Sequence, residues 1–172
     1  IPKFGSMNLH ASLLPKYRGA SPIQTALMNG DTTLGVTSFI INKEIDTGRI
    51  IKQLNQEFDD KTLYSVAYKA LSILGANLLI DSIDLLNKKS NMLIQSNKSL
   101  FHAPKIKKSD YQINLNNSAY TIHNKIRGLT SSSPPKPFLF INNKKVNFIN
   151  TYYSDNKISN YKIGEHYFDC NK

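Results

Sequence analysis

Three polar residues in the first third of the chain have the types and spacing for acyl-transfer chemistry. Asn8 and His10 are two residues apart in a short apolar run that is typical of a strand end, so their side chains should point to the same side. Asp46 follows a second predicted strand and would return to complete the set. An amide N–H and an imidazolium can stabilise the oxyanion of a tetrahedral intermediate, and a carboxylate can orient the imidazole or help move a proton. Out of context, a single His, or a single Asp before Thr-Gly, is more often structural than catalytic.

Short elements of an α/β chain are expected to position these residues. The hydrophobic pattern and the Pro and Gly residues predict, in order, a helix that begins at Pro22 and stops at Asn29-Gly30, a strand over 36–42, a connection over 46–48 and a strand over 49–54. A long helix should follow, capped by Asp59 or Asp60 and extending toward Lys88. Its core stripe is predicted to consist of Leu63, Val66, Ala67, Ala70, Leu71, Leu74 and Leu78.

The second half of the chain has a different pattern. Residues 87–108 lose helical periodicity and gain Lys, Ser and Asn, which is typical of a linker. Ser118 would cap a short helix whose inward residues are Ala119, Ile122, Ile126 and Leu129. The run 142–145 indicates a hairpin between strands over 138–141 and 146–153, and residues 166–169 could form another strand.

A series of short motifs between residues 7 and 50 resembles the folate-dependent formyltransferases, in particular those that act on methionyl-tRNA. The matching motifs are Asn8-x-His10, Ser12-Leu13-Leu14-Pro15, Tyr17-Arg18-Gly19, Pro22-Ile23, Leu34-Gly35-Val36-Thr37 and Asp46-x-Gly48. The match is long and gapless, whereas Asn-x-His alone would carry no information. The resemblance implies catalytic roles for Asn8, His10 and Asp46, with Asp46 holding His10 in its charged form.

The resemblance also implies binding residues. Ser12, Leu13, Leu14 and Pro15 would shape the pocket for 10-formyltetrahydrofolate, the formyl donor, although a loop of this kind can also be a packed connection. Arg18 is predicted to bind substrate as a clamp for an anion, or to clamp a backbone carbonyl, or to be an ordinary surface charge.

In the second half, the segments 103–106 and 123–129 resemble the start of the barrel domain that follows the catalytic domain in these enzymes. Lys105, Lys107, Lys108 and Arg127 are predicted to contact tRNA, and His123, one helical turn before Arg127, could meet the same phosphates. For His123 and Arg127, the alternative is that both lie on a solvated helix face.

Charge is distributed unevenly along the chain. The whole formal charge of +10 lies in residues 87–172, since residues 1–86 contain equal numbers of basic and acidic residues. Lysines interleaved with aromatic residues suit contact with a nucleic-acid backbone. Coding bias toward Lys, Asn and Ile is the alternative, although it explains less readily why the first half is neutral.

The fold class expected from these observations is α/β. The resemblance implies the C-terminal half of a Rossmann-like domain with an open parallel sheet over 1–88, a linker over 89–108 and an incomplete barrel, similar to an oligonucleotide-binding fold, over 109–172. The 172 residues, 40% hydrophobic, can bury a core. Neither a membrane span nor a signal peptide is indicated, no metal-ligand spacing is present, and the single Cys170 cannot form an internal disulfide. A cytoplasmic monomer is therefore expected.

The activity that the resemblance implies is transfer of a formyl group from 10-formyltetrahydrofolate to the amino group of methionyl-initiator tRNA. Roughly a hundred residues of the family pattern are missing before Asn8, so an internal fragment is expected rather than an autonomous enzyme. Two alternatives remain open. One is a formyltransferase that acts on a nucleotide-linked amino sugar or on glycinamide ribonucleotide, and the other is an inactive fragment that only binds RNA.

Overall fold

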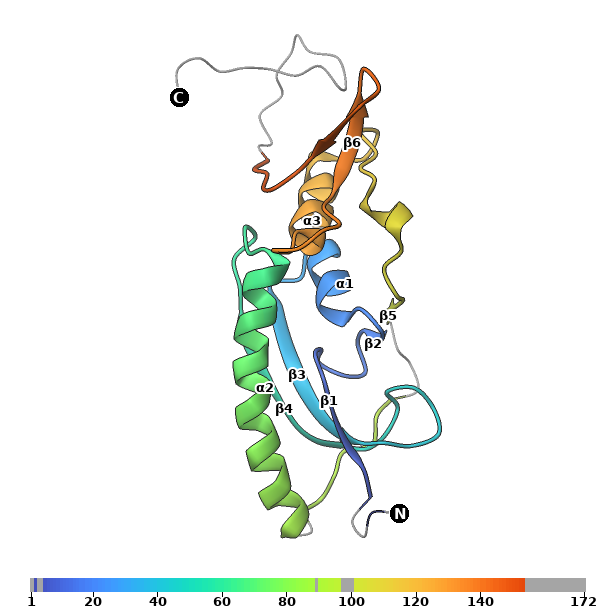
Figure 1. The fold of residues 1–172 in the computed structure, drawn as a ribbon. Coiled ribbons are helices and arrows are strands. Elements are labelled where there is room, and N and C mark those ends of the chain that lie inside the picture. Colours follow the sequence, from blue (N-terminus) through green and yellow to red (C-terminus); the bar gives the residue numbers. More distant parts are fainter. Residues whose placement is uncertain (1, 3–4, 89, 97–100, 154–172) are drawn as a thin grey trace.

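The computed structural model describes residues 2, 5–88, 90–96 and 101–153 (Figure 1). Its elements are, in chain order, β1 (Met7–His10), β2 (Arg18–Gly19), α1 (Pro22–Met28), β3 (Thr33–Ile40), β4 (Ile50–Glu57), α2 (Tyr64–Asn87), β5 (His102–Ala103), the short 3₁₀ helix η1 (Lys108–Tyr111), α3 (Ala119–Leu129), β6 (Phe138–Ile141) and β7 (Lys144–Asn147). The predicted helix at Pro22, both strands of the first half and the connection over 46–48 are confirmed, with boundaries shifted by up to three residues.

The main sheet has the order β1-β3-β4 and is antiparallel throughout. The expected parallel sheet is therefore wrong for these three strands. Six consecutive residues of β3, 34–39, are buried, as expected of the central strand, which has β1 on one side and β4 on the other. In the β1–β3 pair, Asn8 lies opposite Phe39 and His10 lies opposite Thr37, so these four side chains share one face of the sheet.

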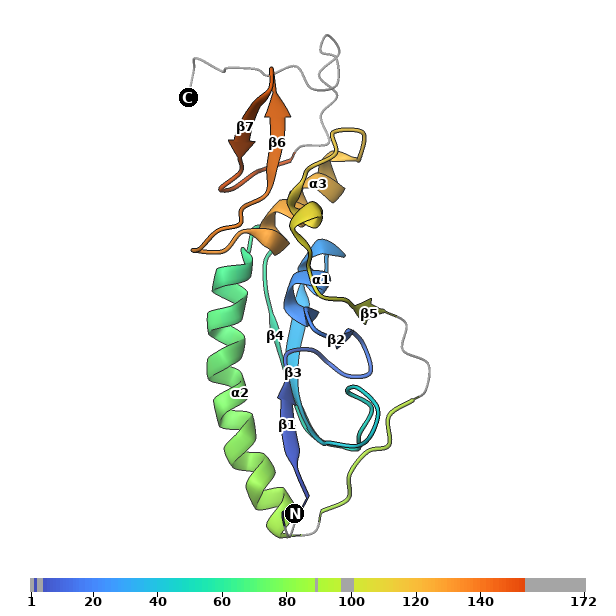
Figure 2. The same ribbon diagram turned by 45° about the vertical axis from the view of Figure 1, so that its right-hand side comes forward.

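The other face of the sheet packs against α2 (Figures 1 and 2). The buried stripe of α2 is Ala67, Leu71, Gly75, Leu78 and Ser82. A Cβ at Gly75 would meet the side chain of Leu9, so the missing side chain lets the helix approach β1 closely. By length and composition alone α2 could cross a membrane, which the sequence did not indicate, yet here it covers a sheet.

Two details of α2 differ from the prediction. The predicted cap is wrong, because Leu63 occupies the N-cap position and Asp59 instead accepts hydrogen bonds from Lys61 N and Thr62 Oγ1 in the preceding turn. Val66 is exposed and does not belong to the core stripe. Val66 and Ala67 are adjacent and both apolar, so the sequence does not decide which of them faces the core. The position of the sheet determines that Ala67 is buried and Val66 is exposed.

The second region consists of α3, which packs on α1, and the β6–β7 hairpin above it (Figure 2). Ser118 caps α3 as predicted, since its Oγ accepts from Thr121 N at 3.1 Å. The hairpin and its first strand are confirmed, but the second strand is Lys144–Asn147 and does not extend to residue 153 as predicted. Asn142 and Asn143 supply the left-handed backbone conformation of its two-residue turn. No closed barrel is present among residues 101–153. The predicted strand over 166–169 and Cys170 lie outside the described residues.

The segment expected as a linker is attached to the first half at two places. Leu93 and Ile50 exchange two backbone hydrogen bonds of 2.8 and 2.9 Å. Further on, β5 pairs with β2 in parallel, with Gly19 opposite Ala103. A Cβ at Gly19, where φ is +125°, would overlap the carbonyl of Ala103, so this close approach requires glycine. This segment is therefore held against β4 at Leu93 and against β2 at His102–Ala103.

Candidate active site

His10 ends β1 and lies between two oxygen acceptors. Its Nε2 is 2.8 Å from the carbonyl oxygen of Tyr17, and its Nδ1 is 3.6 Å from Oδ2 of Asp46. A carbonyl only accepts, so Nε2 must carry a proton in this arrangement. At 3.6 Å the Asp46 carboxylate is an ion-pair partner of Nδ1 rather than a hydrogen-bond acceptor. His10 is buried, and both contacts are therefore largely shielded from water.

The chain conformation around Asp46 explains how a residue of the β3–β4 connection reaches His10. This connection curls over the sheet on the side opposite α2, toward β2 and β5 (Figure 1). Asp46 adopts φ of 54°, a left-handed conformation that Asp tolerates better than most residues. Its Oδ2 also accepts the backbone N–H of Gly19 at 2.9 Å. The carboxylate is thus fixed from β2 while it faces the imidazole.

Asn8 lies one pleat before His10, on the same face of the sheet, and is exposed. The structure thus brings His10 and Asp46 into direct contact and leaves the Asn8 amide on the accessible part of the same surface. An exposed donor beside a buried imidazole is suited to a reacting group that approaches from solvent.

Arg18 is held by a residue from the segment that was expected to be a linker. Its Nε and Nη2 donate to Oε1 of Gln95 at 3.1 and 2.7 Å, and Nη2 also donates to the carbonyl of Ser96 at 3.1 Å. The amide nitrogen of Gln95 donates in turn to the carbonyls of Asp46 and Gly48, at 3.0 and 2.7 Å. Arg18 therefore contacts protein carbonyl groups here, and its predicted substrate contact stays a prediction.

The loop predicted to shape the folate pocket is packed against the sheet. Thr37 Oγ1 donates to the carbonyl of Ser12 at 2.6 Å and accepts the N–H of Leu14 at 3.1 Å. The hydroxyl of Ser12 bonds the carbonyl of Lys16, and the side chain of Leu14 is buried with Phe39 and Ile50. Ser12 and Leu14 thus match the alternative of a packed connection. Leu13 and Pro15 are partly accessible.

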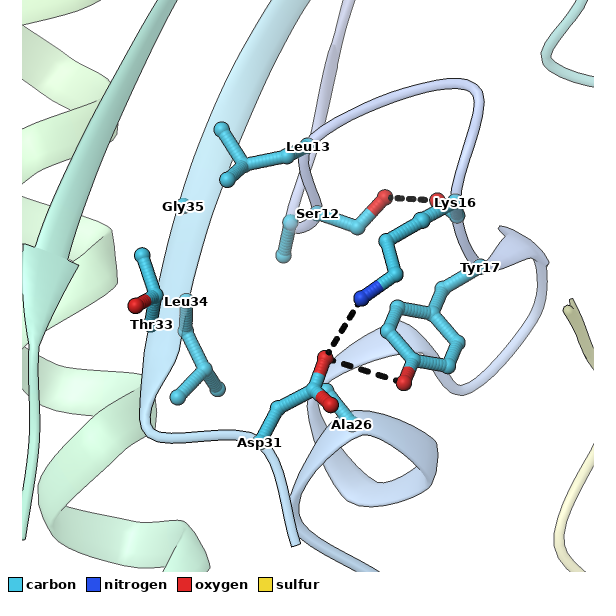
Figure 3. A pocket seen from close by; sticks show the side chains of 10 residues that line it. Ser12, Leu13, Lys16, Tyr17, Ala26, Asp31, Thr33, Leu34 and Gly35 are labelled. Atoms are coloured by element: carbon cyan, nitrogen blue, oxygen red, sulfur yellow. Dashed lines mark hydrogen bonds and ion pairs between the residues drawn. The ribbon is translucent and has the colours of Figure 1, made fainter. Parts of the chain in front are cut away.

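A cavity of about 130 Å³ lies beside this loop (Figure 3). Leu13 lines it, and so do Lys16, Tyr17 and Asp31, with Asp31 Oδ2 accepting from Lys16 Nζ at 3.2 Å and from the Tyr17 hydroxyl at 2.9 Å. Burial raises the pKa of Tyr17 to about 12. The ring anchors Tyr17 in a left-handed conformation with φ of 60°, and this residue supplies the carbonyl that faces His10.

Two residues predicted to meet RNA phosphates are buried instead. Arg127 is only 1% exposed, and its guanidinium donates to Oδ1 of Asn124 at 2.7 Å and to the carbonyl of Asp31 at 3.4 Å. Burial lowers the pKa of Arg127. His123 is also buried, with Nε2 2.8 Å from the carbonyl of Asp60. This placement contradicts the phosphate contacts, because α3 turns both side chains toward the first half of the chain.

The other predicted RNA contacts are accessible. Three exposed lysines, called the linker lysines below, lie between β5 and the first residue of η1, which is the third of them: Lys105, Lys107 and Lys108. Among the described residues, no cluster of three His, Cys, Asp or Glu side chains suitable for a metal ion is found.

Sequence reasoning missed three groups that hold this site, namely the Tyr17 carbonyl, the Gly19 N–H and the side chain of Gln95. The motif Tyr17-Arg18-Gly19 was noted, but a motif does not say which backbone atoms it turns inward. Gln95 gave no signal, because it stands in a polar stretch without periodicity.

Known protein families and sequences that are similar to this chain identify its relatives. Residues 1–83 match the formyl transferase family, and residues 105–170 match the formyl transferase C-terminal domain. The chain is 42% identical over 151 residues to the methionyl-tRNA formyltransferase of Thermodesulfovibrio yellowstonii, covering 88% of this chain and 48% of that protein. It is 36% identical over 165 residues to the methionyl-tRNA formyltransferase of Ehrlichia canis, covering 95% and 52%. The chain thus spans about half the length of the curated relatives it matches.

Solved structures agree with this assignment. An N-formyltransferase from Helicobacter canadensis, in complex with folinic acid and dTDP-3-aminofucose, superposes with a TM-score of 0.76 at 26% identity, covering 94% of this chain and 59% of that one. Methionyl-tRNA formyltransferase from Clostridium thermocellum superposes with a TM-score of 0.70 at 22% identity, covering 91% and 69%, and so supports the fold alone. The two family matches follow one another along a mixed α/β chain, and this protein therefore belongs to the folate-dependent formyltransferase family.

Proposed function

We propose that this chain is the part of a methionyl-tRNA formyltransferase that contains the reacting centre. The reaction is transfer of a formyl group to the amino group of methionine on initiator tRNA. The observation that supports it best is the His10 imidazole, held between the Tyr17 carbonyl and the Asp46 carboxylate on the sheet face that also presents the exposed Asn8. Sequence identity to the methionyl-tRNA formyltransferases of Thermodesulfovibrio yellowstonii and Ehrlichia canis, 42% and 36%, is higher than the 26% identity to the enzyme in complex with dTDP-3-aminofucose. The superposed methionyl-tRNA formyltransferase of Clostridium thermocellum, at 22%, does not add to this difference.

In the proposed mechanism the free amine attacks the formyl carbon, and negative charge develops on the formyl oxygen. The Asn8 amide donates to this oxygen, and the positive charge of protonated His10 stabilises it, since both ring nitrogens of His10 already face Tyr17 and Asp46. Asp46 pairs with the imidazole and orients it. The new C–N bond forms as the bond from the formyl carbon to the donor nitrogen breaks. The attacking nitrogen loses one proton, and the leaving nitrogen gains one.

The formyl donor would be 10-formyltetrahydrofolate, which supplies the activated formyl group. Apolar side chains suitable for a flat ring are exposed on the connection that presents Asp46. Ile45, directly before Asp46, is 74% exposed, and Ile41 is also exposed. These two side chains would offer apolar contact to the ring beside the reacting groups. Leu13 and Pro15, the accessible members of the packed loop, would complete the contact.

The RNA partner would meet the second half of the chain. The linker lysines are exposed, and the positive charge of the chain lies in residues 87–172. Lysines on an accessible segment neutralise phosphates without reading sequence. An enzyme of this kind would act in the cytoplasm, where initiator tRNA is charged.

The domain division is part of the same proposal. Residues 1–88 would belong to a Rossmann-like catalytic domain, 89–108 would connect the domains, and 109–172 would belong to a barrel-type tRNA-binding domain. The antiparallel strands β1, β3 and β4 would form one end of a larger sheet. The pairing of β6 with β7 supports a β-rich second domain.

A nucleotide-linked amino sugar is the second candidate substrate. The likeness to the Helicobacter canadensis N-formyltransferase, with a TM-score of 0.76, favours it. Both substrates offer a primary amine, so the reacting centre alone does not distinguish them.

A formyl-transfer assay tests both candidates. The 172-residue chain is assayed alone and as a completed chain, joined to the part of the Thermodesulfovibrio yellowstonii relative that it does not match. We expect the completed chain to formylate methionyl-initiator tRNA and not a dTDP-linked amino sugar. Transfer to the sugar alone would favour the second candidate. Tight RNA binding by a completed, folded chain that formylates neither amine would overturn the proposal and leave the RNA-binding alternative.

A further inference from the structure

Gln95 lies outside both family matches, which end at residue 83 and resume at residue 105. Its side chain nevertheless makes four hydrogen bonds at the candidate active site. Oε1 accepts both Nε and Nη2 of Arg18, and Nε2 donates to the carbonyls of Asp46 and Gly48. Gln95 is 7% exposed, so these contacts replace water that the buried amide would otherwise bind.

The contacts join the two chain segments that must be held in place for Asp46 to face His10. One segment is β2, where Arg18 binds Gln95 and the next residue, Gly19, donates its N–H to the Asp46 carboxylate. The other is the β3–β4 connection, which Gln95 holds by the backbone carbonyls on both sides of Thr47. The amide therefore fixes the Asp46 backbone while Gly19 fixes its side chain.

The backbone conformation of Asp46 needs such support. A non-glycine residue with φ of 54° occupies a sparsely populated region, which persists when surrounding contacts determine it. Ile45 before it is exposed, and the polar residues of the 42–45 stretch are exposed as well, so packing of side chains does not hold the turn. Within the turn, the Thr47 hydroxyl contacts Asn42 Oδ1 and the Glu44 carbonyl, but both contacts are exposed to water. The two hydrogen bonds from Gln95 come from a segment that is itself tied to β4 through Leu93 and Ile50.

We propose that Gln95 is a positioning residue of this active site, which holds Asp46 in the conformation that faces His10. The expected effect of Gln95 on catalysis rests on the proposed function, whereas its role in holding Asp46 does not. The contacts above join Gln95 to Arg18, Asp46 and Gly48 and not to His10. Gln95 therefore acts through Asp46.

A double-mutant cycle tests the catalytic half in the completed chain. Gln95→Met keeps the length of the side chain and removes all four hydrogen bonds. We expect it to lower kcat about tenfold and to leave KM for methionyl-tRNA within about twofold. In an Asp46→Asn background the same substitution should lower kcat by less than about twofold, because the group through which it acts is already impaired. Ser82→Ala is the control, since it removes a buried hydrogen bond to Ser38 on the α2 side of the sheet.

A purely structural role for Gln95 would give the same fold-reduction of kcat in both backgrounds, as expected for Ser82→Ala, and would overturn the proposal. Unchanged kcat in Gln95→Met would overturn it as well. If the completed chain formylates no amine, the proposed function fails, and the positioning role is decided by a second measurement.

That measurement is hydrogen exchange of the Gly19 amide in the 172-residue chain, because this N–H donates to Asp46 Oδ2. We expect Gln95→Met to accelerate Gly19 exchange at least tenfold, without a matching change at the amides of β3, and Ser82→Ala to leave it unchanged. Equal Gly19 exchange in the parent and in Gln95→Met would refute the positioning role.

Discussion

Asp46→Asn removes the charge of the carboxylate and keeps the shape of the side chain. The amide oxygen of asparagine can still accept the Gly19 N–H, so the connection should keep its conformation. Asp46 Oδ2 lies 3.6 Å from Nδ1 of His10. At an effective dielectric constant of about 20, opposite unit charges at this distance attract by about 4–5 kcal/mol.

Solvent reduces this figure, since the side chain of Asp46 is 13% exposed. If about half of this attraction acts in the transition state, loss of the carboxylate charge raises the activation free energy by about 2–3 kcal/mol. The corresponding loss in turnover is roughly 30- to 150-fold. The measurement is kcat of the completed chain at saturating methionyl-tRNA, with the melting temperature recorded for each variant.

Asp81→Asn is the matched control. Asp81 also pairs with a cation, Lys52 Nζ at 2.6 Å, but both side chains are substantially exposed and Asp81 lies on α2. A pair of this kind contributes little to stability, so kcat should stay within about twofold. If folded Asp46→Asn retained kcat within about threefold of the parent, the carboxylate charge would not act on His10, and the proposed role of the contact would be wrong.

Four further outcomes can be measured on the same molecule. His10→Ala and Asn8→Ala should each lower turnover by on the order of a hundredfold with RNA affinity nearly intact, since loss of an oxyanion donor costs about 2.7–4 kcal/mol; near-normal turnover would contradict the assigned roles. Serine at the three linker lysines should flatten the dependence of log Kd on log salt by about 0.7–0.9 for each phosphate that is no longer neutralised, and an unchanged slope would leave coding bias as the explanation of the charge. Arg127→Met should leave RNA affinity unchanged, because the guanidinium is buried, and weakened binding would refute this placement. Since the pKa of Tyr17 is raised from 10.0 to about 12, its protonated form stabilises the fold fully below pH 10 and progressively less toward pH 12. Urea unfolding should show a loss of about 1.4 kcal/mol by pH 11 that is absent in Tyr17→Phe, and equal losses would contradict the raised pKa.

Local elements of this protein could be predicted from its sequence. The strand that ends at His10, the helix that begins at Pro22, the Ser118 cap and the Asn142-Asn143 turn all depend on contacts between residues a few positions apart, or on backbone preferences of single residues. Such signals can be recognised without the rest of the fold. The candidate reacting residues were also chosen from the sequence, but mainly through the resemblance of a long motif series, because a single His or Asp is ambiguous.

Which polar groups meet depends instead on the packing of distant segments. Gln95 bonds Arg18 across 77 positions and Asp46 across 49, and no local pattern encodes contacts of that range. For Arg127, the local spacing predicted an exposed side chain that contacts phosphate. The packing of α3 on α1 buries it instead. The antiparallel direction of β1 against β3 was likewise outside the reach of periodicity, because alternation along a strand gives its faces and not its partner. The physical reason is common to all three: local conformation depends on nearby residues, whereas the site depends on which distant surfaces exclude water together.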